Sequence, residues 1–167
     1  NGGVTKPKLK VLIGRMRDVI TWPEPDPKGI NVVGDIILTD AAKLINVEVT
    51  PSTIAVSQPS EGDPDNKGHK PKIEMSRPGG LDLPFEEFVE NNLNEDLFAI
   101  IQYIGGKNKV AGYPGNPLQM SVESTDNNEG DTSKITLEAT LRGRRMAIYT
   151  GQIPLVEGET AGSAGGA

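Results

Sequence analysis

The stretch Thr132-Ser-Lys-Ile-Thr-Leu-Glu-Ala-Thr-Leu141 alternates apolar and polar side chains along most of its length. Successive side chains of a strand point to opposite faces of a sheet, so this two-residue period predicts a strand with one buried and one solvated face. The predicted buried face carries Ile135, Leu137, Ala139 and Leu141, and the solvated face carries Lys134, Thr136, Glu138 and Thr140. The pattern sets the expectation of a mainly β protein.

Working outward, further segments rich in apolar and β-branched residues have strand character. They are Lys8–Ile13 with a continuation in Arg15–Ile20, Ile30–Thr39, Lys43–Thr50, Thr53–Gln58, Lys72–Ser76, Asp96–Ile104, Pro117–Glu123, Arg144–Thr150 and Gln152–Val156. Gly14 predicts a bulge in the first of these. Ile30–Thr39 is apolar on both faces and predicts a strand covered on both sides. About nine short strands predict a two-sheet antiparallel β-sandwich or barrel.

A single segment, at about residues 84–93, has helical periodicity. The sequence Pro84-Phe-Glu-Glu-Phe-Val-Glu-Asn-Asn-Leu93 places its apolar side chains on one face: Phe85, Phe88, Val89 and Leu93. Asp82 is suited to the N-cap and Pro84 to the first turn. Because two of the three phenylalanines lie here, the inserted α-helix is predicted to pack into the core.

The chain is the size of one domain, and residues 1–156 are predicted to form a single β-sandwich domain. A Pro-rich arm occupies residues 21–29, with the only tryptophan, Trp22, as its anchor, and a polar loop occupies residues 59–71. Residues 157–167 are Gly- and Ala-rich and predict a flexible tail. With 35% hydrophobic residues, 20 Gly and 13 Pro, some of these segments are expected to become ordered only against a neighbouring copy.

Composition excludes several classes of site. The chain has no cysteine, which excludes disulfides, zinc-thiolate sites and thiol catalysis. No apolar run approaches the roughly 20 residues that span a membrane, so no membrane span is expected. A net charge of −6 disfavours nucleic-acid binding as the main activity, because phosphate contacts need clustered cations.

The sequence predicts no catalytic residue, no cofactor site and no metal site, and therefore a protein that is not an enzyme. His69 is the only histidine, so neither a catalytic triad nor a multi-histidine metal site can be built. Asp63-Pro-Asp65-Asn-Lys67-Gly68 with Glu74 matches part of a calcium-binding loop, but Lys67 stands where an oxygen ligand is needed. No phosphate-binding glycine loop is present.

Charge is distributed unevenly along the chain, which suits contact between copies. The beginning is basic, Arg142, Arg144 and Arg145 form a second basic cluster, and the turn-rich loop Ser124–Asp131 is acidic. The predicted intersubunit contact residues are Lys8, Lys10, Arg15, Arg17, Trp22, Asp126, Asn127, Asn128, Glu129, Asp131, Arg144 and Arg145. A solvated surface and, for the arginines, a salt-bridged strand end explain the same charges without any partner.

With these features assembled, the chain resembles the tail tube (major tail) proteins of tailed bacteriophages, which are related to the tube proteins of contractile injection and type VI secretion systems. The resemblance covers most of residues 8–156. It is carried by the basic strand Lys8–Val19, the helix Pro84–Leu93, the loop Ser124–Asp131 before the alternating strand, and the closing segment Ala147-Ile-Tyr-Thr-Gly-Gln-Ile153.

The resemblance implies a structural protein of the virion, assembled in the cytoplasm of a bacterial host. Its copies would form hexameric rings that stack around a lumen, and DNA would pass through the lumen without specific binding. Its partners would be copies of itself and other virion proteins. Two alternatives stay open: a head decoration or minor virion structural protein, and a secreted ligand-binding β-sandwich module. Aromatic residues at 4% of the chain argue against a glycan-binding version of the second.

Overall fold

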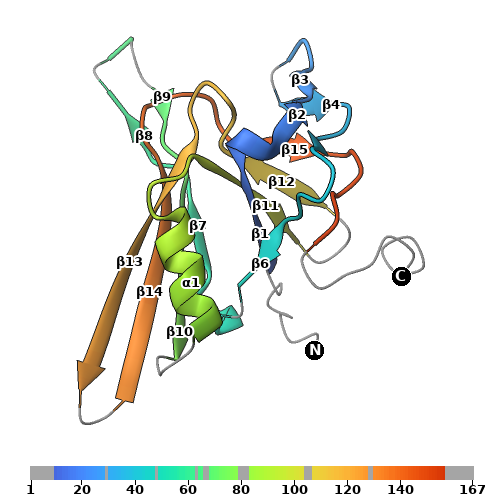
Figure 1. Cartoon of the computed structure of the whole chain (residues 1–167). Coiled ribbons are helices and arrows are strands. Elements are labelled where there is room, and N and C mark those ends of the chain that lie inside the picture. The colour runs from blue at the N-terminus through green and yellow to red at the C-terminus, as the bar shows by residue number, and fades with distance from the viewer. Residues whose placement is uncertain are drawn as a thin grey trace, which may run out of the picture.

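The structure is a computed structural model that describes residues 10–28, 30–47, 49–62, 64–65, 68–78, 83–103, 107–127 and 130–156 (Figure 1). These residues form a mainly β fold with one α-helix, which confirms the predicted fold class. The elements are β1 Lys10–Arg15, η1 Met16–Asp18, β2 Val19–Thr21, β3 Glu24–Pro25, β4 Asn31–Val33, β5 Ile37–Leu38, β6 Ile45–Asn46, η2 Pro51–Thr53, β7 Ala55–Ser57, β8 Ser60–Glu61, β9 Gly68–His69, β10 Lys72–Pro78, α1 Leu83–Asn92, β11 Leu97–Gln102, β12 Asn108–Ala111, β13 Leu118–Asn127, β14 Gly130–Ala139 and β15 Ala147–Tyr149.

The main sheet consists of two halves that join at β11. Strand β11 pairs with β1 along one edge, and along the other edge it pairs with β12 and then, through Leu97 and Leu118, with β13. One half has the order β6-β1-β11-β12-β15-β4-β3, and the other has the order β13-β14-β10-β7. Two small sheets, β2–β5 and β8–β9, complete the described strands. Pairing is antiparallel except between β4 and β15, which are parallel, so the sheet is mixed rather than wholly antiparallel.

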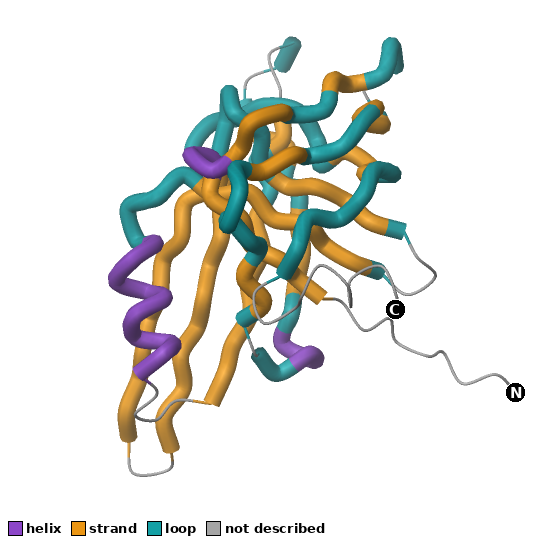
Figure 2. Tube along the Cα trace, turned by 45° about the vertical axis from the view of Figure 1, so that its right-hand side comes forward, coloured by secondary structure: helices purple, strands orange, loops and turns teal. Residues whose placement is uncertain are grey.

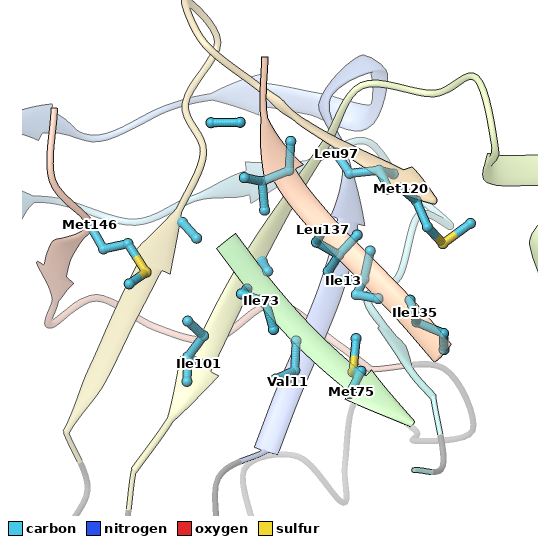
Figure 3. Packing of buried hydrophobic residues seen from close by; sticks show 14 of the residues in the cluster. Val11, Ile13, Ile73, Met75, Leu97, Ile101, Met120, Ile135, Leu137 and Met146 are labelled. Carbon is cyan, nitrogen blue, oxygen red and sulfur yellow. The ribbon is translucent and has the colours of Figure 1, made fainter. Parts of the chain in front are cut away.

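The two halves enclose the first hydrophobic core (Figure 3). Strands β1, β11 and β12 contribute Val11, Ile13, Leu97, Ala99, Ile101 and Ala111, and strands β10, β13 and β14 contribute Ile73, Met75, Leu118, Met120, Ile135, Leu137 and Ala139. The alternation predicted for β14 is therefore confirmed from Ile135 to Ala139. Leu141 departs from it, because β14 ends at Ala139 and the Leu141 side chain is 63% exposed.

A second core covers the opposite face of β1 and β11. It contains Leu12, Phe98 and Ile100 from these strands, together with Tyr149. The Tyr149 hydroxyl accepts a hydrogen bond from Ile36 N at 2.9 Å and donates one to Gln152 O at 2.5 Å, which satisfies its polar group inside an apolar cluster. Strands β1 and β11 are therefore covered on both faces.

The prediction that Ile30–Thr39 is the doubly covered strand is wrong. The segment is broken into β4 and β5 by Gly34, which has φ +115°, a conformation open mainly to glycine. Ile30 and Ile37 are 54% and 48% exposed. An apolar run alone does not distinguish one long central strand from two short strands with a turn between them.

Gly14 serves close packing rather than the predicted bulge. Strand β1 runs through it in unbroken register with β11. A Cβ atom at this position would overlap the Phe98 ring and lie 2.8 Å from Leu44 Cδ2. The absence of a side chain at Gly14 therefore makes the space that the Phe98 ring occupies.

Three segments predicted as loops or as an arm contain strands. The segment Ser124–Asp131 belongs to the β13–β14 hairpin, whose ten register pairs extend to Asn127 and Gly130. The polar loop 59–71 contains the β8–β9 pair, and the Pro-rich arm contains β3, which pairs with β4. Trp22 anchors this arm within its own domain, because its ring lies edge-on to Phe98 with 5.3 Å between centroids. Turn-forming residues did not end these strands because neighbouring strands supply hydrogen bonds.

Helix α1 lies along the sheet formed by β10, β14 and β13, beside the hairpin (Figure 2). It begins and ends one residue earlier than predicted, and Asp82 lies outside the described residues. Phe85 is 7% exposed and joins the first core, with the Arg77 guanidinium 4.2 Å from its ring centroid. Phe88 and Val89 are partly buried against that core, whereas Leu93 is 42% exposed and follows the helix.

Truncating the phenylalanines of α1 should have unequal effects. Phe85→Ala should lower the free energy of unfolding by about 3–5 kcal/mol, because it empties a buried site. Phe88→Ala should cost less, because its ring already has contact with solvent. Urea unfolding followed by circular dichroism measures both, and equal losses would contradict this packing.

Adding one carbon at position 14 should destabilise the second core. Gly14→Ala forces Phe98 and Leu44 to move and should cost about 1–3 kcal/mol. In the double variant with Phe98→Leu, the smaller side chain gives space to the new methyl group. The losses of unfolding free energy in the two single variants should then sum to more than the loss measured for the double variant. Strict additivity would show that the ring and the glycine are not coupled.

Candidate intersubunit site

The β13–β14 hairpin extends past helix α1 and past the half of the sheet that contains β1 and β11 (Figure 1). Its base belongs to the core, where Met120 and Ile135 are buried and Val122 is partly buried. From Glu123 outward the β13 side chains that are described are exposed. The hairpin thus changes along its length from a core element to a polar projection.

One edge of β13 is open over most of its length. Strand β10 covers the outer edge of β14 from Glu138 to Thr132. On the other side, β13 meets β11 only through Leu118, and within the described ranges no strand pairs with its edge from Gln119 to Asn127. Such an edge presents unpaired backbone groups to a further strand.

A groove of about 550 Å³ lies between α1 and the β1–β6 edge. Ile45 and Val47 line it on the sheet side, and Phe85 and Phe88 line it on the helix side. Polar residues complete the lining: Arg15, Asn46, Arg77, Glu87, Asn91 and Asn92, with Pro84. Apolar surface and two guanidinium groups therefore border the same hollow.

Both guanidinium groups of the groove are held by neighbours. Arg15 Nε donates a hydrogen bond to Asn92 Oδ1 at 2.7 Å, and Asn92 Nδ2 donates to Phe88 O, also at 2.7 Å. Asn92 is 1% exposed, so it links the end of α1 firmly to β1. Arg77 is held by its stacking on Phe85. Planar guanidinium groups fixed in this way favour carboxylate or phosphate ligands.

The predicted basic contact residues do not form one surface. Arg15 lines the groove, whereas Arg17 Nη1 forms an ion pair with Glu95 Oε1 at 3.2 Å. Lys10 is exposed at the start of β1, and Lys8 lies outside the described residues. Strand β1, which carries Lys10 and Arg15, ends at Arg15, and Arg17 belongs to η1. The change from strand to 3-10 helix separates the directions of these side chains.

The second basic cluster lies in the segment between β14 and β15. Arg144 places its guanidinium 4.2 Å from the Tyr113 ring centroid, and Arg145 is exposed. The buried side chain of Asn116 holds this segment, because its Nδ2 donates to Leu141 O at 2.6 Å and its Oδ1 accepts from Leu141 N at 2.9 Å. Stacking on an aromatic ring, rather than a strand-end salt bridge, is thus the contact shown for Arg144.

The acidic contact residues lie at the far end of the hairpin. Asp126 and Asn127 end β13, and Asp131 lies near the start of β14 as the register partner of Asp126. Asn128 and Glu129 lie outside the described residues. The remaining predicted contact residue, Trp22, is half-buried against Phe98 in its own chain.

The residues weighed for chemistry are occupied by ordinary surface contacts. His69 Nδ1 lies 3.4 Å from Ser60 Oγ in the β8–β9 pair. Glu74 forms ion pairs with Lys72 at 2.9 Å and Lys134 at 3.8 Å, and its hydrogen bond from Lys72 lowers the pKa of the Glu74 carboxyl. Asp63 and Lys67 lie outside the described residues. In the described parts of the chain, no three His, Asp or Glu side chains converge to hold a metal ion, and no helix is long and apolar enough to cross a membrane.

Removing the buried amide of Asn92 should loosen α1. Asn92→Ala takes the acceptor from Arg15 and leaves Phe88 O without its side-chain donor, so the free energy of unfolding should fall by about 1–3 kcal/mol. The neighbouring Asn91 is exposed, and Asn91→Ala serves as the control, with a change within about 0.5 kcal/mol. Chemical denaturation measures both variants. Equal, small effects would show that the Arg15–Asn92 link does not hold the helix.

A scan against models of protein families, a search of curated proteins and a search of solved structures each gave no match to this chain. The likeness to tail tube proteins accordingly stays a prediction from sequence. What the structure adds is geometric: an open-edged hairpin with acidic residues near its end, and a groove bordered by Arg15 and Arg77.

Proposed function

We propose that this chain is a structural protein whose copies assemble into rings, and that the rings stack to form the tail tube of a bacteriophage. The observation that carries the proposal is the β13–β14 hairpin, because its outer part is polar and β13 has an open edge. A single domain gains little stability from such a projection. Between copies, it supplies backbone hydrogen bonds and a defined register.

The character of the open edge suits controlled pairing. Gln119, Ser121, Glu123 and Thr125 are exposed along β13, and none of them is apolar. An exposed apolar edge invites pairing with any chain, whereas a polar edge pairs only where a partner complements it. The hairpin therefore fits specific contact between copies better than it fits aggregation.

A tube also accounts for the overall chemistry of the chain. A net charge of −6 disfavours tight phosphate contacts, which suits a conduit through which DNA moves without stalling. The partners would be copies of the chain and other virion proteins, the location the virion, and the role non-catalytic. A head decoration or minor virion protein would use the same hairpin in a different assembly.

A second candidate, a ligand-binding β-sandwich, is favoured by the groove beside α1. Its volume of about 550 Å³ lies within the range of clefts that hold small ligands, roughly 300–1,000 Å³. This candidate predicts a protein that stays monomeric at high concentration. The oligomeric state therefore decides between the two candidates.

Shortening the hairpin in register tests the proposal. The shortened variant lacks the last two register pairs of the hairpin, Asp126–Asp131 and Asn127–Gly130. Asn128–Glu129 then follows Thr125 and precedes Thr132 directly, so the register of the remaining pairs is kept. The expected product is a folded monomer that fails to assemble, because it loses only the projecting end. Sedimentation velocity and negative-stain imaging measure assembly, and thermal unfolding followed by circular dichroism measures folding.

The control keeps the hairpin at full length and replaces Glu90, an exposed carboxylate of α1 that does not line the groove, by Gln. This control should assemble as the intact chain does. Full-length tubes formed by the shortened variant would contradict the proposal. An intact chain that stays monomeric at high concentration would reject it in favour of the ligand-binding module.

A further inference from the structure

We infer that a shallow basic platform, formed around the segment between β14 and β15, receives the first turns of α1 from a second copy of this chain. In this contact Leu83 lies on the apolar part of the platform, and the carboxylates of Glu86 and Glu87 meet the guanidinium groups of Arg144 and Arg145. The inference rests on the proposed stacking of rings and names the two surfaces that join one ring to the next.

The platform combines apolar rings with two cations. Four side chains supply much of its apolar surface: Trp22, Pro25, Pro71 and Tyr113. Arg144 and Arg145 border the same surface, and none of its described lining residues is Asp or Glu. A partner that suits it therefore carries an apolar side chain next to negative charge.

Both guanidinium groups of the platform are available to a carboxylate. Arg144 stacks on the Tyr113 ring, with 4.2 Å between its guanidinium carbon and the ring centroid. Stacking orders the planar group and leaves the N–H donors at its edge accessible. Arg144 and Arg145 are exposed, and among the described residues no carboxylate forms an ion pair with either. Such groups bind carboxylates through charge-assisted hydrogen bonds.

The outer face of α1 has the matching character. Leu83 is 69% exposed, the highest value among the large hydrophobic side chains that the structure describes. Glu86 and Glu87 are exposed and follow three and four positions later, which places them beside Leu83 on one face of the helix. Helix α1 contains no Lys or Arg. Because Phe85 holds the opposite face on the first core, this acidic face points away from its own domain.

The two surfaces lie at opposite ends of β10 within one chain. Strand β10 begins directly after Pro71 at the platform and ends at Pro78, which pairs with Thr132 near the hairpin end, and α1 is the next element. In Figure 1 the segment between β14 and β15 lies in the upper part of the molecule, and α1 lies lower, beside the hairpin. The contact is therefore heterologous, because each copy offers one helix face and one platform, and it can repeat from copy to copy.

This contact runs along the strands, whereas pairing at the open edge of β13 runs across them. Strands add to a sheet edge perpendicular to their own direction. The β13 edge thus serves contact between neighbours within a ring, and the platform serves contact between the ends of copies in successive rings.

Mixing two half-defective variants tests the inference. The platform variant Arg144→Gln/Arg145→Gln removes both guanidinium charges, and the helix variant Glu86→Gln/Glu87→Gln removes two carboxylates. Each alone should form single rings, with a dissociation constant for stacking raised about tenfold or more. When rings assembled separately are mixed, the intact helix face of one variant meets the intact platform of the other. Negative-stain imaging should then show paired rings that do not grow further.

Trp22 gives a second readout that belongs to the platform. It is the only tryptophan of the chain, and it lines the platform in a half-buried position. Contact with Leu83 excludes water from its ring, so its fluorescence emission should shift to shorter wavelength when rings of the intact chain stack. Leu83→Ser should weaken stacking and remove this shift. Its unfolding temperature should not fall, because the Leu83 side chain is already mostly in solvent.

Two controls accompany these variants. Glu90→Gln removes a carboxylate one turn further along α1 and should stack like the intact chain. Arg144→Lys/Arg145→Lys keeps both charges and should stack to an intermediate degree, because an ammonium group lacks the two-pronged geometry of guanidinium. Thermal unfolding followed by circular dichroism establishes that each variant is folded.

The outcomes separate the inference from the proposed function. Tubes of normal length formed by the platform variant, or Trp22 emission that does not change when intact rings stack, would overturn the inference and leave the proposed function standing. An intact chain that does not assemble overturns both. The two contacts are also told apart by their products, because the shortened hairpin should give monomers and the platform variant should give single rings.

Discussion

The packing of Phe98 across Gly14 is the contact on which most of this structure depends. It allows β1 and β11 to pair in unbroken register while the Phe98 ring packs over Gly14 in the second core. On the other face, Ile13 and Ile101 of the same two strands form the first core with β10 and β14. A chain with only 35% hydrophobic residues thus concentrates its burial in one strand pair used on both sides.

This concentration explains why the hairpin is free to project. Strand β13 leaves the common edge of β11 after Leu118, and from there its partners are β14 and, beyond it, β10. The half of the sheet that contains β1 does not extend along the outer part of β13. Phe85 of α1 covers the part of the first core that would otherwise be exposed there. The same arrangement leaves the groove between α1 and β6, where Arg15 of β1 is hydrogen-bonded to Asn92 of α1.

The sequence predicts those features of the fold that depend on neighbouring residues, and it does not predict those that depend on contacts between residues far apart in the chain. The alternation of Ile135 and Leu137 and the period of α1 are local, and both were predicted. The division of Ile30–Thr39 into two strands depends on Gly34 and on the partners of β4, which no local pattern contains. The groove was not predicted, because its lining residues Arg15 and Arg77 lie 62 positions apart in the sequence and come to one groove only when α1 packs between them.

The strands within Ser124–Asp131 show why residue type alone misplaced part of the site. Asp, Asn and Gly favour turns when their backbone groups lack partners. Here β14 supplies partners to β13 as far as Asn127, and the ladder overrides local preference. A loop of these residues would be a flexible acidic segment, whereas the ladder pairs Asp126 with Asp131 across the hairpin. A paired hairpin loses less conformational entropy on binding than a loop of the same residues, which suits the contact between copies that we propose.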